Sequence, residues 1–421
     1  MSHIAEVKVT PIAFRDAPLL NAAGLHEPWA IRSVLEVVLK DGTVGLSETY
    51  GDAITIELLR ACGDDLIGLD IYDRNGLKRR VASTLQRLAP PTADVSPRTA
   101  SVTLLPRIFG AFEVAAFDAV GHLTGRPVYD LLGGACRRDV PFSAYLFYKF
   151  SRHELVKDGW SDPWGNVQSP EEMVREAREM VRRHGFQSLK FKAGVFEPAL
   201  EVETLRALRA AFPQAPLRID PNGAWTVETT LRMLPDFEEL LEYLEDPTMT
   251  IDGMAAVQAK TSLPLATNMC TVAFDHVPET IAKGAVRVIL ADHHFWGGLE
   301  ATKELAAICR TWGIGLSMHS NSHLGISLMA MAHLAAATPN LTYACDTHYP
   351  WEEDEIVEGG TIPFIDGCVR VSDKPGLGVA LDRDALAKLH DNWRSCGIIA
   401  RDDAAELRKY WPDWSSHRPR W

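Results

Sequence analysis

The sequence Ser-Leu-Lys-Phe-Lys-Ala-Gly at residues 188–194, followed by Leu-Arg-Ile-Asp at residues 217–220, is the clearest indication of the fold of this chain. The apolar and alternating residues of these stretches predict buried strands over Ser188–Lys192 and Leu217–Asp220. Between them, Leu200–Phe212 has the apolar spacing of a helix. A strand, a helix and a second strand at this spacing form the right-handed crossover that joins parallel strands. The stretch therefore predicts a parallel sheet covered by helices.

The same alternation continues from about Pro141 to Asp346. Eight strands separated by helices favour a (β/α) barrel, because right-handed crossovers of this spacing close into a ring. The predicted strands are Ser143–Phe147, Ser188–Lys192, Leu217–Asp220, Glu242–Glu245, Leu265–Asn268, Val286–Leu290, Gly315–His319 and Leu341–Cys345. The predicted helices include Glu171–His184, Leu200–Phe212, Leu299–Trp312 and His323–Ala336.

The regions on either side of the barrel have a different pattern. Alternating segments around the hairpin signal Asp41-Gly42 predict a small antiparallel sheet, which helices follow. Arg15–Glu27 lacks periodicity and is expected to be a mobile flap, and the tail Trp351–Trp421 is expected to pack back on the first domain. We expect an N-terminal α+β capping domain at residues 1–130, a catalytic barrel at 131–350 and the tail at 351–421. The N-terminal elements are predicted at Ile4–Pro11, Ser33–Lys40, Thr43–Glu48, Ile54–Leu69 and Ile108–Leu123.

Composition and charge exclude several classes of protein. The 421-residue chain has a net charge of −13, which opposes nonspecific binding to nucleic acid. Its seven cysteines include no Cys-x-x-Cys pair, which indicates reduced thiols rather than disulfides or a zinc knuckle. The N-terminus lacks a signal-peptide pattern, and the most apolar segment, Leu324–Ala337, is too short to span a bilayer and predicts a buried helix. We expect a cytoplasmic homo-oligomer with a small-molecule substrate and no nucleic-acid or membrane partner.

Polar side chains stand at the carboxyl ends of the predicted barrel strands, where barrel enzymes place their chemistry. A single residue of this kind usually caps a helix or satisfies a turn, but here they recur at successive strands. Asp220, Glu245 and Asn268 end three adjacent strands, and their oxygens suit Mg²⁺ with positions left for water and substrate. Tyr145 lies near the end of the first predicted strand, and Asn222 lies at the end of the third, together with Asp220.

Two lysines and a histidine offer acid–base chemistry. Lys190 and Lys192 are two residues apart on one strand, so both face the barrel interior. Desolvation, mutual repulsion and a nearby metal favour the neutral amine, so that one lysine can act as a base near neutral pH. Across the ring, His319 ends the seventh strand and Asp292 follows the sixth, where its carboxylate can orient the imidazole. A solvated lysine pair and a packing histidine are the simpler alternatives.

Nearly the whole chain resembles the mandelate racemase-type branch of the enolase superfamily and, within it, the glucarate dehydratase family. This resemblance implies a (β/α)7β-type modified TIM barrel with an α+β capping domain formed by the N-terminal region and the C-terminal tail. It also implies Mg²⁺ as the cofactor. The matching stretches are residues 188–194, Asp-Pro-Asn-Gly-Ala-Trp at 220–225, Glu-Asp-Pro at 245–247, Ala-Thr-Asn-Met at 266–269, Asp-His-His-Phe-Trp at 292–296, His-Ser-Asn-Ser-His at 319–323, Asp-Thr-His at 346–348, Lys-Pro-Gly-Leu-Gly at 374–378 and Ala-Arg-Asp-Asp-Ala at 400–404.

The resemblance further implies a lyase of carbohydrate catabolism that dehydrates an acid sugar, such as glucarate, to a 2-keto-3-deoxy acid. Lys192 would be the base on one face of the substrate, and Lys190 its electrostatic neighbour. His319, with Asp292, would be the acid–base group on the other face and would help a β-hydroxyl to leave as water. The residues implied to hold the substrate are His26, Tyr145, Asn222 and Arg401.

Two other activities stay open on the same residues. Bases on opposite faces can also carry out racemisation or epimerisation of a hydroxy acid. A Schiff-base aldolase using Lys192 is a further alternative, although it leaves the three metal ligands without a role. His293, which stands where the family has Pro, a shorter loop after Glu245 and an altered segment before Glu113 leave the identity of the acid sugar open.

Overall fold

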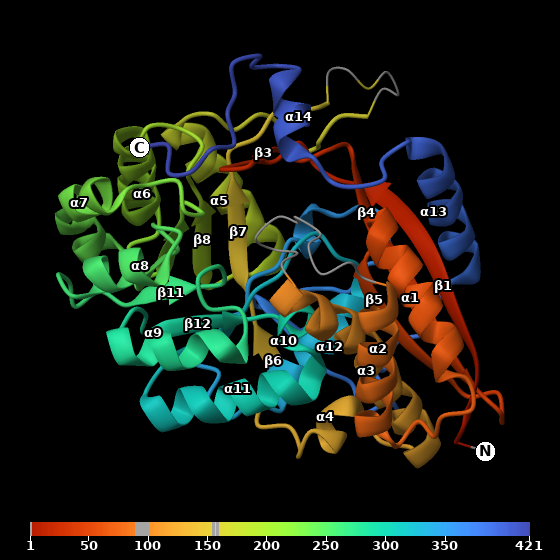
Figure 1. Cartoon of the computed structure of the whole chain (residues 1–421). Coiled ribbons are helices and arrows are strands. Elements are labelled where there is room, and N and C mark those ends of the chain that lie inside the picture. The colour runs from red at the N-terminus through yellow and green to blue at the C-terminus, as the bar shows by residue number, and fades with distance from the viewer. Residues whose placement is uncertain (1, 89–100, 154–155, 157–159) are drawn as a thin grey trace.

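The computed structural model describes residues 2–88, 101–153, 156 and 160–421. In this part of the chain, seven parallel strands form a curled central sheet in the order β13-β12-β11-β10-β9-β8-β7 (Figure 1). Every strand pairs with its sequence neighbour, as expected when each crossover helix returns the chain to the adjacent position. The strands are β7 (Ser143–Phe147), β8 (Ser188–Lys192), β9 (Leu217–Asp220), β10 (Tyr243–Glu245), β11 (Leu265–Thr267), β12 (Val288–Ala291) and β13 (Gly315–Met318).

The segment predicted as the eighth strand, Leu341–Cys345, does not form a regular strand. It nevertheless closes the ring: Thr342 N donates to Leu316 O of β13, and Ser143 N of β7 donates to Cys345 O. The ladder is irregular because the amides of both Thr342 and Tyr343 donate to the same Leu316 carbonyl, at 2.9 and 3.2 Å. Such two-against-one pairing is how an extra residue disrupts a ladder. The barrel is therefore of the (β/α)7β type that the family resemblance implied, and the segment at the eighth strand position is irregular.

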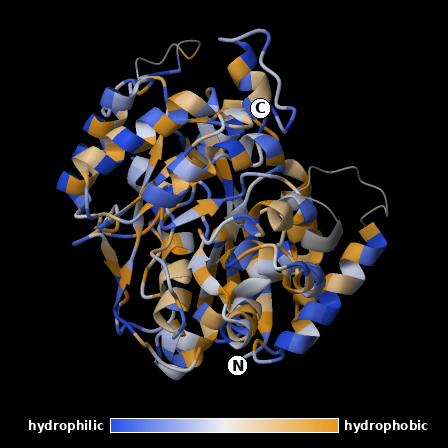
Figure 2. Cartoon of the chain, turned by 90° about the vertical axis from the view of Figure 1, so that its left-hand side faces the viewer, coloured by the Kyte–Doolittle hydropathy of each residue, from blue (hydrophilic) through white to orange (hydrophobic). Residues whose placement is uncertain are grey.

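Helices cover the outside of this sheet (Figure 1). In Figure 2 blue and orange residues are interspersed along the outer helices, as an amphipathic cover requires. All twelve residues of α12 (Gly325–Ala336) are buried, which confirms the predicted apolar helix. The other barrel helices are α5 (Pro170–His184), α6 (Pro198–Ala211), α7 (Val227–Leu240), α8 (Ile251–Gln258), α9 (Val277–Lys283), α10 (His293–Trp296) and α11 (Gly298–Trp312), with 3-10 turns η1 (Phe274–His276) and η2 (Tyr349–Trp351).

A three-stranded antiparallel sheet lies beside the barrel, in the order β1 (Ile4–Arg15), β4 (Trp29–Leu39) and β5 (Val44–Tyr50). Strand β1 continues four residues beyond the predicted end at Pro11. Proline is tolerated there because β1 is an edge strand of this sheet, where a missing amide breaks no ladder bond. The helices of this region are α1 (Ala53–Leu66), α2 (Arg74–Leu88), α3 (Ser101–Thr124) and α4 (Val128–Leu131).

The flap segment between β1 and β4 folds into a small hairpin, β2 (Leu20–Asn21) with β3 (Gly24–Leu25). The amide of Leu20 donates to Tyr148 O, so the hairpin is bonded to the chain that follows β7. Both tail helices pack on N-terminal elements: α13 (Arg383–Cys396) packs on β1, and α14 (Asp403–Arg408) packs on β3. Two short strands, β6 (Asp139–Pro141) and β14 (Cys368–Arg370), pair antiparallel.

No helix in the described part of the chain is both long enough and apolar enough to cross a membrane.

Candidate active site

The three predicted metal ligands meet at the carboxyl end of the central sheet. Asp220 and Glu245 are the last residues of β9 and β10, and Asn268 directly follows β11. The ammonium of Lys190 lies 3.8 Å from Asp220 Oδ2 and 2.6 Å from Glu245 Oε2. Asn268 Nδ2 in turn donates to Glu245 Oε1 at 2.6 Å. The parallel register of the strands thus brings all three side chains to one point, where each is nearly buried.

The donor chemistry of this point fits a hard divalent cation. Two carboxylates and a carboxamide are the oxygen ligands that Mg²⁺ prefers. Glu245 Oε2 is buried and has no well-directed hydrogen bond within the described structure, although it lies close to the Lys190 ammonium. Burial and the neighbouring Asp220 raise the pKa of Glu245 well above its usual value. A cation held here would satisfy an oxygen that the protein leaves open.

A neighbouring carboxylate holds the third ligand in place. Asp246 accepts hydrogen bonds from Asn268 N at 2.8 Å and from Thr267 Oγ1 at 2.5 Å. Each of its two carboxylate oxygens accepts one of these bonds, Oδ1 from Thr267 and Oδ2 from Asn268. Asp246 therefore fixes the end of β11 and does not itself join the donor set.

The two lysines of β8 have different electrostatic surroundings. Burial would lower the pKa of Lys190, but Asp346 and Glu245 outweigh it and raise that pKa well above its usual value. Lys190 is hydrogen-bonded to both carboxylates. Burial lowers the pKa of Lys192, although its 2.6 Å contact with Asp220 opposes the shift. The lowered pKa of Lys192 agrees with the expectation of a neutral amine. The pKa of Lys190 is shifted in the opposite direction, because of its ion pairs with Asp346, which the sequence did not predict, and with Glu245.

His319 and Asp292 form a directed pair. Asp292 Oδ2 lies 3.0 Å from His319 Nδ1, while its other oxygen accepts from His294 N at 2.8 Å and caps α10. Burial would raise the pKa of Asp292, but the hydrogen bond with His319 and the nearby imidazoles lower it. The carboxylate is thus held by a helix start on one side and orients the imidazole on the other.

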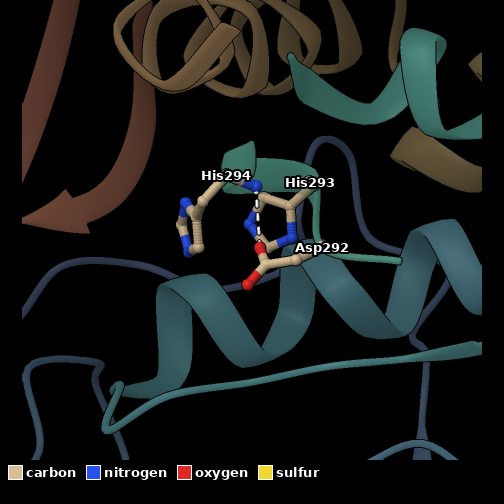
Figure 3. Close-up of side chains that lie close together, drawn as sticks. All are labelled: Asp292, His293 and His294. Carbon is tan, nitrogen blue, oxygen red and sulfur yellow. Dashed lines mark hydrogen bonds between the residues drawn. The ribbon is translucent and has the colours of Figure 1, made fainter. Parts of the chain in front are cut away.

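Asp292, His293 and His294 also lie close together, with one potential ligand atom from each within 4.8 Å of the others (Figure 3). This group is a poor cation site, because Arg32 Nη2 lies 3.1 Å from His294 Nε2 and Asp292 is already engaged with His319. Burial lowers the pKa of His293 to about 4, so its ring is neutral near pH 7. We interpret both histidines as packing residues.

Tyr145 and Asn222 line the same end of the barrel as the donor set. The ring of Tyr145 lies 4.7 Å from the Lys190 ammonium, and its hydroxyl lies 3.5 Å from Asp220 Oδ2. Asn222 has a left-handed backbone (φ 56°), which asparagine tolerates better than most residues. Its Nδ2 is buried without a hydrogen-bond partner in the described residues, whereas Arg418 donates to its two oxygens at 2.7 and 3.0 Å.

The other two predicted substrate residues come from outside the barrel. His26 on the flap stacks with His348 at 6.0 Å, and His348 in turn contacts Tyr145 at 4.8 Å. Arg401 is 37% exposed, and its Nε and Nη2 bind Asp403 at 2.6 and 2.9 Å. One edge of the guanidinium is therefore occupied by Asp403. Within the described chain, Nη1 is the guanidinium nitrogen that remains for a ligand.

Sequence reasoning assigned no role to several residues that the structure brings here. Asp346 pairs with Lys190, and Ser320 lies 3.3 Å from His348 Nδ1 through its hydroxyl. Asp346 and His348 follow the last predicted barrel strand, so the same rule of polar strand ends would have found them. Arg418 carried no such signal, because its contact with Asn222 spans 196 residues.

Comparison with known proteins identifies the class. The family model described as enolase C-terminal domain-like matches residues 172–385, and the chain belongs to the enolase superfamily. It is 47% identical over 428 residues to probable glucarate dehydratase from Streptomyces coelicolor, covering 99% of each protein. It is therefore an enzyme related to acid-sugar dehydratases.

Solved structures agree closely with this fold. An enolase from Thermobispora bispora complexed with magnesium and formate superposes with a TM-score of 0.96 at 51% identity, covering all of both chains. An enolase from Pseudomonas fluorescens with bound magnesium, potassium and tartrate gives a TM-score of 0.96 at 48% identity, covering 100% of this chain and 99% of the other.

Proposed function

We propose that the protein is a Mg²⁺-dependent dehydratase that converts a glucarate-like acid sugar to a 2-keto-3-deoxy acid. The observation that carries this proposal is the combination, at one barrel mouth, of a carboxylate-oriented imidazole, an amine with a lowered pKa and three hard oxygen donors. The similarity to probable glucarate dehydratase supports the same reaction type. The magnesium in the related solved structures supports the cofactor.

Asp220, Glu245 and Asn268 would hold the metal. When bound there, Mg²⁺ would stabilise the negative charge that develops on the substrate carboxylate as the neighbouring carbon loses its proton. Lys190, fully buried between Asp346 and Glu245, stays charged and adds a fixed positive charge to the same end of the site.

Lys192 is the proposed base. Its lowered pKa favours the free amine, and Asp220 holds its position at 2.6 Å. His319 is the proposed acid–base group on the other side, with Nδ1 held by Asp292 and Nε2 therefore turned away toward the substrate. Proton removal by Lys192 followed by proton delivery from His319 to the departing β-hydroxyl gives the enol of the keto acid and water.

The far end of the substrate would lie under the flap. His26 and Arg401 both come from outside the barrel, and His26 is only 3% exposed, so an occupied site would be screened from water. A distal carboxylate suits the Nη1 side of Arg401 through a charge-assisted bond. The tartrate in the Pseudomonas fluorescens relative is likewise a small hydroxylated dicarboxylate, which supports this class of ligand. The three-part domain division, a cytoplasmic location and a homo-oligomer remain predictions.

The test is a substrate screen with the purified protein and Mg²⁺. Glucarate, its hexaric diastereomers, gluconate and tartrate would be incubated and assayed for keto acid with semicarbazide, and the substrate proton would be followed by NMR in D₂O. We expect keto acid from at least one hexaric acid, formed about two to four powers of ten more slowly by the His319→Asn variant prepared in parallel. Proton exchange or epimerisation without keto acid would replace the dehydratase with the racemase alternative. Trapping by borohydride would instead indicate the aldolase.

A further inference from the structure

Asp16, directly after β1, carries a buried carboxylate that the proposed reaction does not use. Only 2% of its surface is exposed. Its Oδ2 lies 3.1 Å from His26 Nδ1 and accepts a hydrogen bond from Ser322 Oγ at 3.0 Å. Its backbone carbonyl lies 3.3 Å from His153 Nε2. The first residues of the flap thus contact its other end at His26, the loop after β13 and the chain after β7.

The contact with His26 selects the state of the imidazole. A carboxylate accepts but cannot donate, so His26 Nδ1 must carry the proton that lies between them. Nε2 is then the ring nitrogen directed away from Asp16. The ring is also fixed in space by Phe147 and His348, each with its centroid at 6.0 Å. This arrangement repeats, on the flap, what Asp292 does for His319.

The contact with Ser322 reaches the loop that carries the other acid–base group. Ser322 lies three residues after His319, in the loop between β13 and α12. A single carboxylate oxygen therefore joins the flap hairpin to this loop across 306 residues of sequence. A displacement of Asp16 would therefore disturb its contacts with both His26 and the loop that carries His319.

Stability alone does not explain a carboxylate at this place. Asp16 Oδ1 is buried without a hydrogen-bond partner in the described structure. Glu352 interacts electrostatically with Asp16, and both of its carboxylate oxygens are also buried without a hydrogen-bond partner among the described residues. Burying such oxygens unpaired is unfavourable, and apolar side chains would fill the space at lower free energy. Arg401 is near enough to feel the charge of Asp16, which places the carboxylate at the proposed distal end of the substrate.

We propose that Asp16 is a positioning residue for the substrate site: it keeps the proton of His26 on Nδ1, presents Nε2 to the substrate, and holds the flap against the loop of His319. This inference rests on the proposed function for its kinetic consequence. Its structural consequence, the protonation of His26 Nδ1, does not depend on any substrate.

The first measurement is therefore ¹⁵N NMR of the histidine side chains in the full-length protein, with His26 assigned from a His26→Gln spectrum. We expect a protonated Nδ1 in the wild type, and a shift to the Nε2–H tautomer in Asp16→Ala. If the alanine variant does not fold, Asp16→Leu, which has a similar shape but no acceptor, takes its place with the same expected shift. Ser322→Ala should leave the His26 signal unchanged. A wild-type His26 without a proton on Nδ1 would overturn the proposal.

The second measurement is steady-state kinetics with the acid that the screen identifies. Misplacing a substrate contact costs about tenfold to a hundredfold, so we expect Asp16→Ala to lower kcat/KM by that factor, with a raised KM. Asn392→Ala, which removes a bond from Asn392 Nδ2 to Ala13 O on the preceding strand β1, is the matched control and should behave as wild type. An Asp16→Ala enzyme with wild-type KM and kcat would contradict the positioning role. If no acid is converted, the proposed function fails while the NMR result still decides the role of Asp16.

Discussion

Replacing Asp292 with Asn separates the chemical role of this residue from its structural one. Asp292 caps α10 through one oxygen and orients His319 through the other, at 2.8 and 3.0 Å. Asparagine is as good an N-cap as aspartate, so the helix start should survive. The substitution removes the charge that stabilises a protonated His319, and its amide can donate to Nδ1 and so favour the wrong tautomer.

The magnitude follows from the bond that is lost. A hydrogen bond to a charged group contributes about 1.5–3 kcal/mol, and each 1.4 kcal/mol is a factor of ten in rate. Asp292→Asn should therefore lower kcat by at least about tenfold and up to about 150-fold, more where the tautomer is also wrong. Because the cap is retained, the midpoint of thermal unfolding should change little.

The assay is keto-acid formation at saturating substrate and Mg²⁺, together with thermal unfolding followed by circular dichroism. Asp382→Asn is a matched control, since Asp382 caps α13 by accepting from Asp384 N and Ala385 N and lies outside the site. The control should keep wild-type kcat. A folded Asp292→Asn enzyme with more than half of the wild-type kcat would refute the assignment of Asp292 as the group that orients His319.

Three further outcomes are expected. Lys192→Ala and His319→Asn should each lower turnover by about two to four powers of ten, and a loss below tenfold in a folded variant would remove that residue from the mechanism. Exhaustive EDTA treatment should abolish activity, and added Mg²⁺ should restore it. The Glu245→Gln variant should require more Mg²⁺ for half-maximal rate, because it loses a charged ligand. Full activity in EDTA would contradict a metal enzyme. Burial lowers the pKa of His333 from 6.5 to about 4, and its Nδ1 accepts from Tyr129 N, so the unfolded chain takes up this proton first as the pH falls. Stability should decline from about pH 6.5 to pH 4 by about 3 kcal/mol through this group, and urea unfolding should show a smaller decline for His333→Gln.

The barrel could be predicted from the sequence because its signal is local. Ser188–Lys192 and Leu217–Asp220 have the predicted bounds in the structure, since a buried parallel strand leaves an apolar run and its crossover helix leaves a 3.6-residue period. The segment Leu341–Cys345 was predicted as the eighth strand for the same local reason. Its irregular pairing depends on how the two edges of the sheet meet when the barrel closes, and a short stretch of sequence carries no information about that.

The proposed metal ligands and acid–base residues could also be predicted from the sequence, because each lies at the end of a strand and the ends of parallel strands lie together. Their roles stay predictions. The order of the strands was enough to predict that these side chains lie close together. The two strand ends after β11 follow the same rule, with Asp292 beside β12 and His319 beside β13.

The long-range partners of the charged side chains became known only from the three-dimensional structure. Lys190 is paired with Asp346 across 156 residues, and Asp16 with Ser322 across 306. Asp403, which occupies one edge of Arg401, also accepts a hydrogen bond from Asn21 of the flap across 382 residues. The physical reason is that periodicity reports which face of an element is buried, whereas an ion pair depends on which two faces meet and at what register.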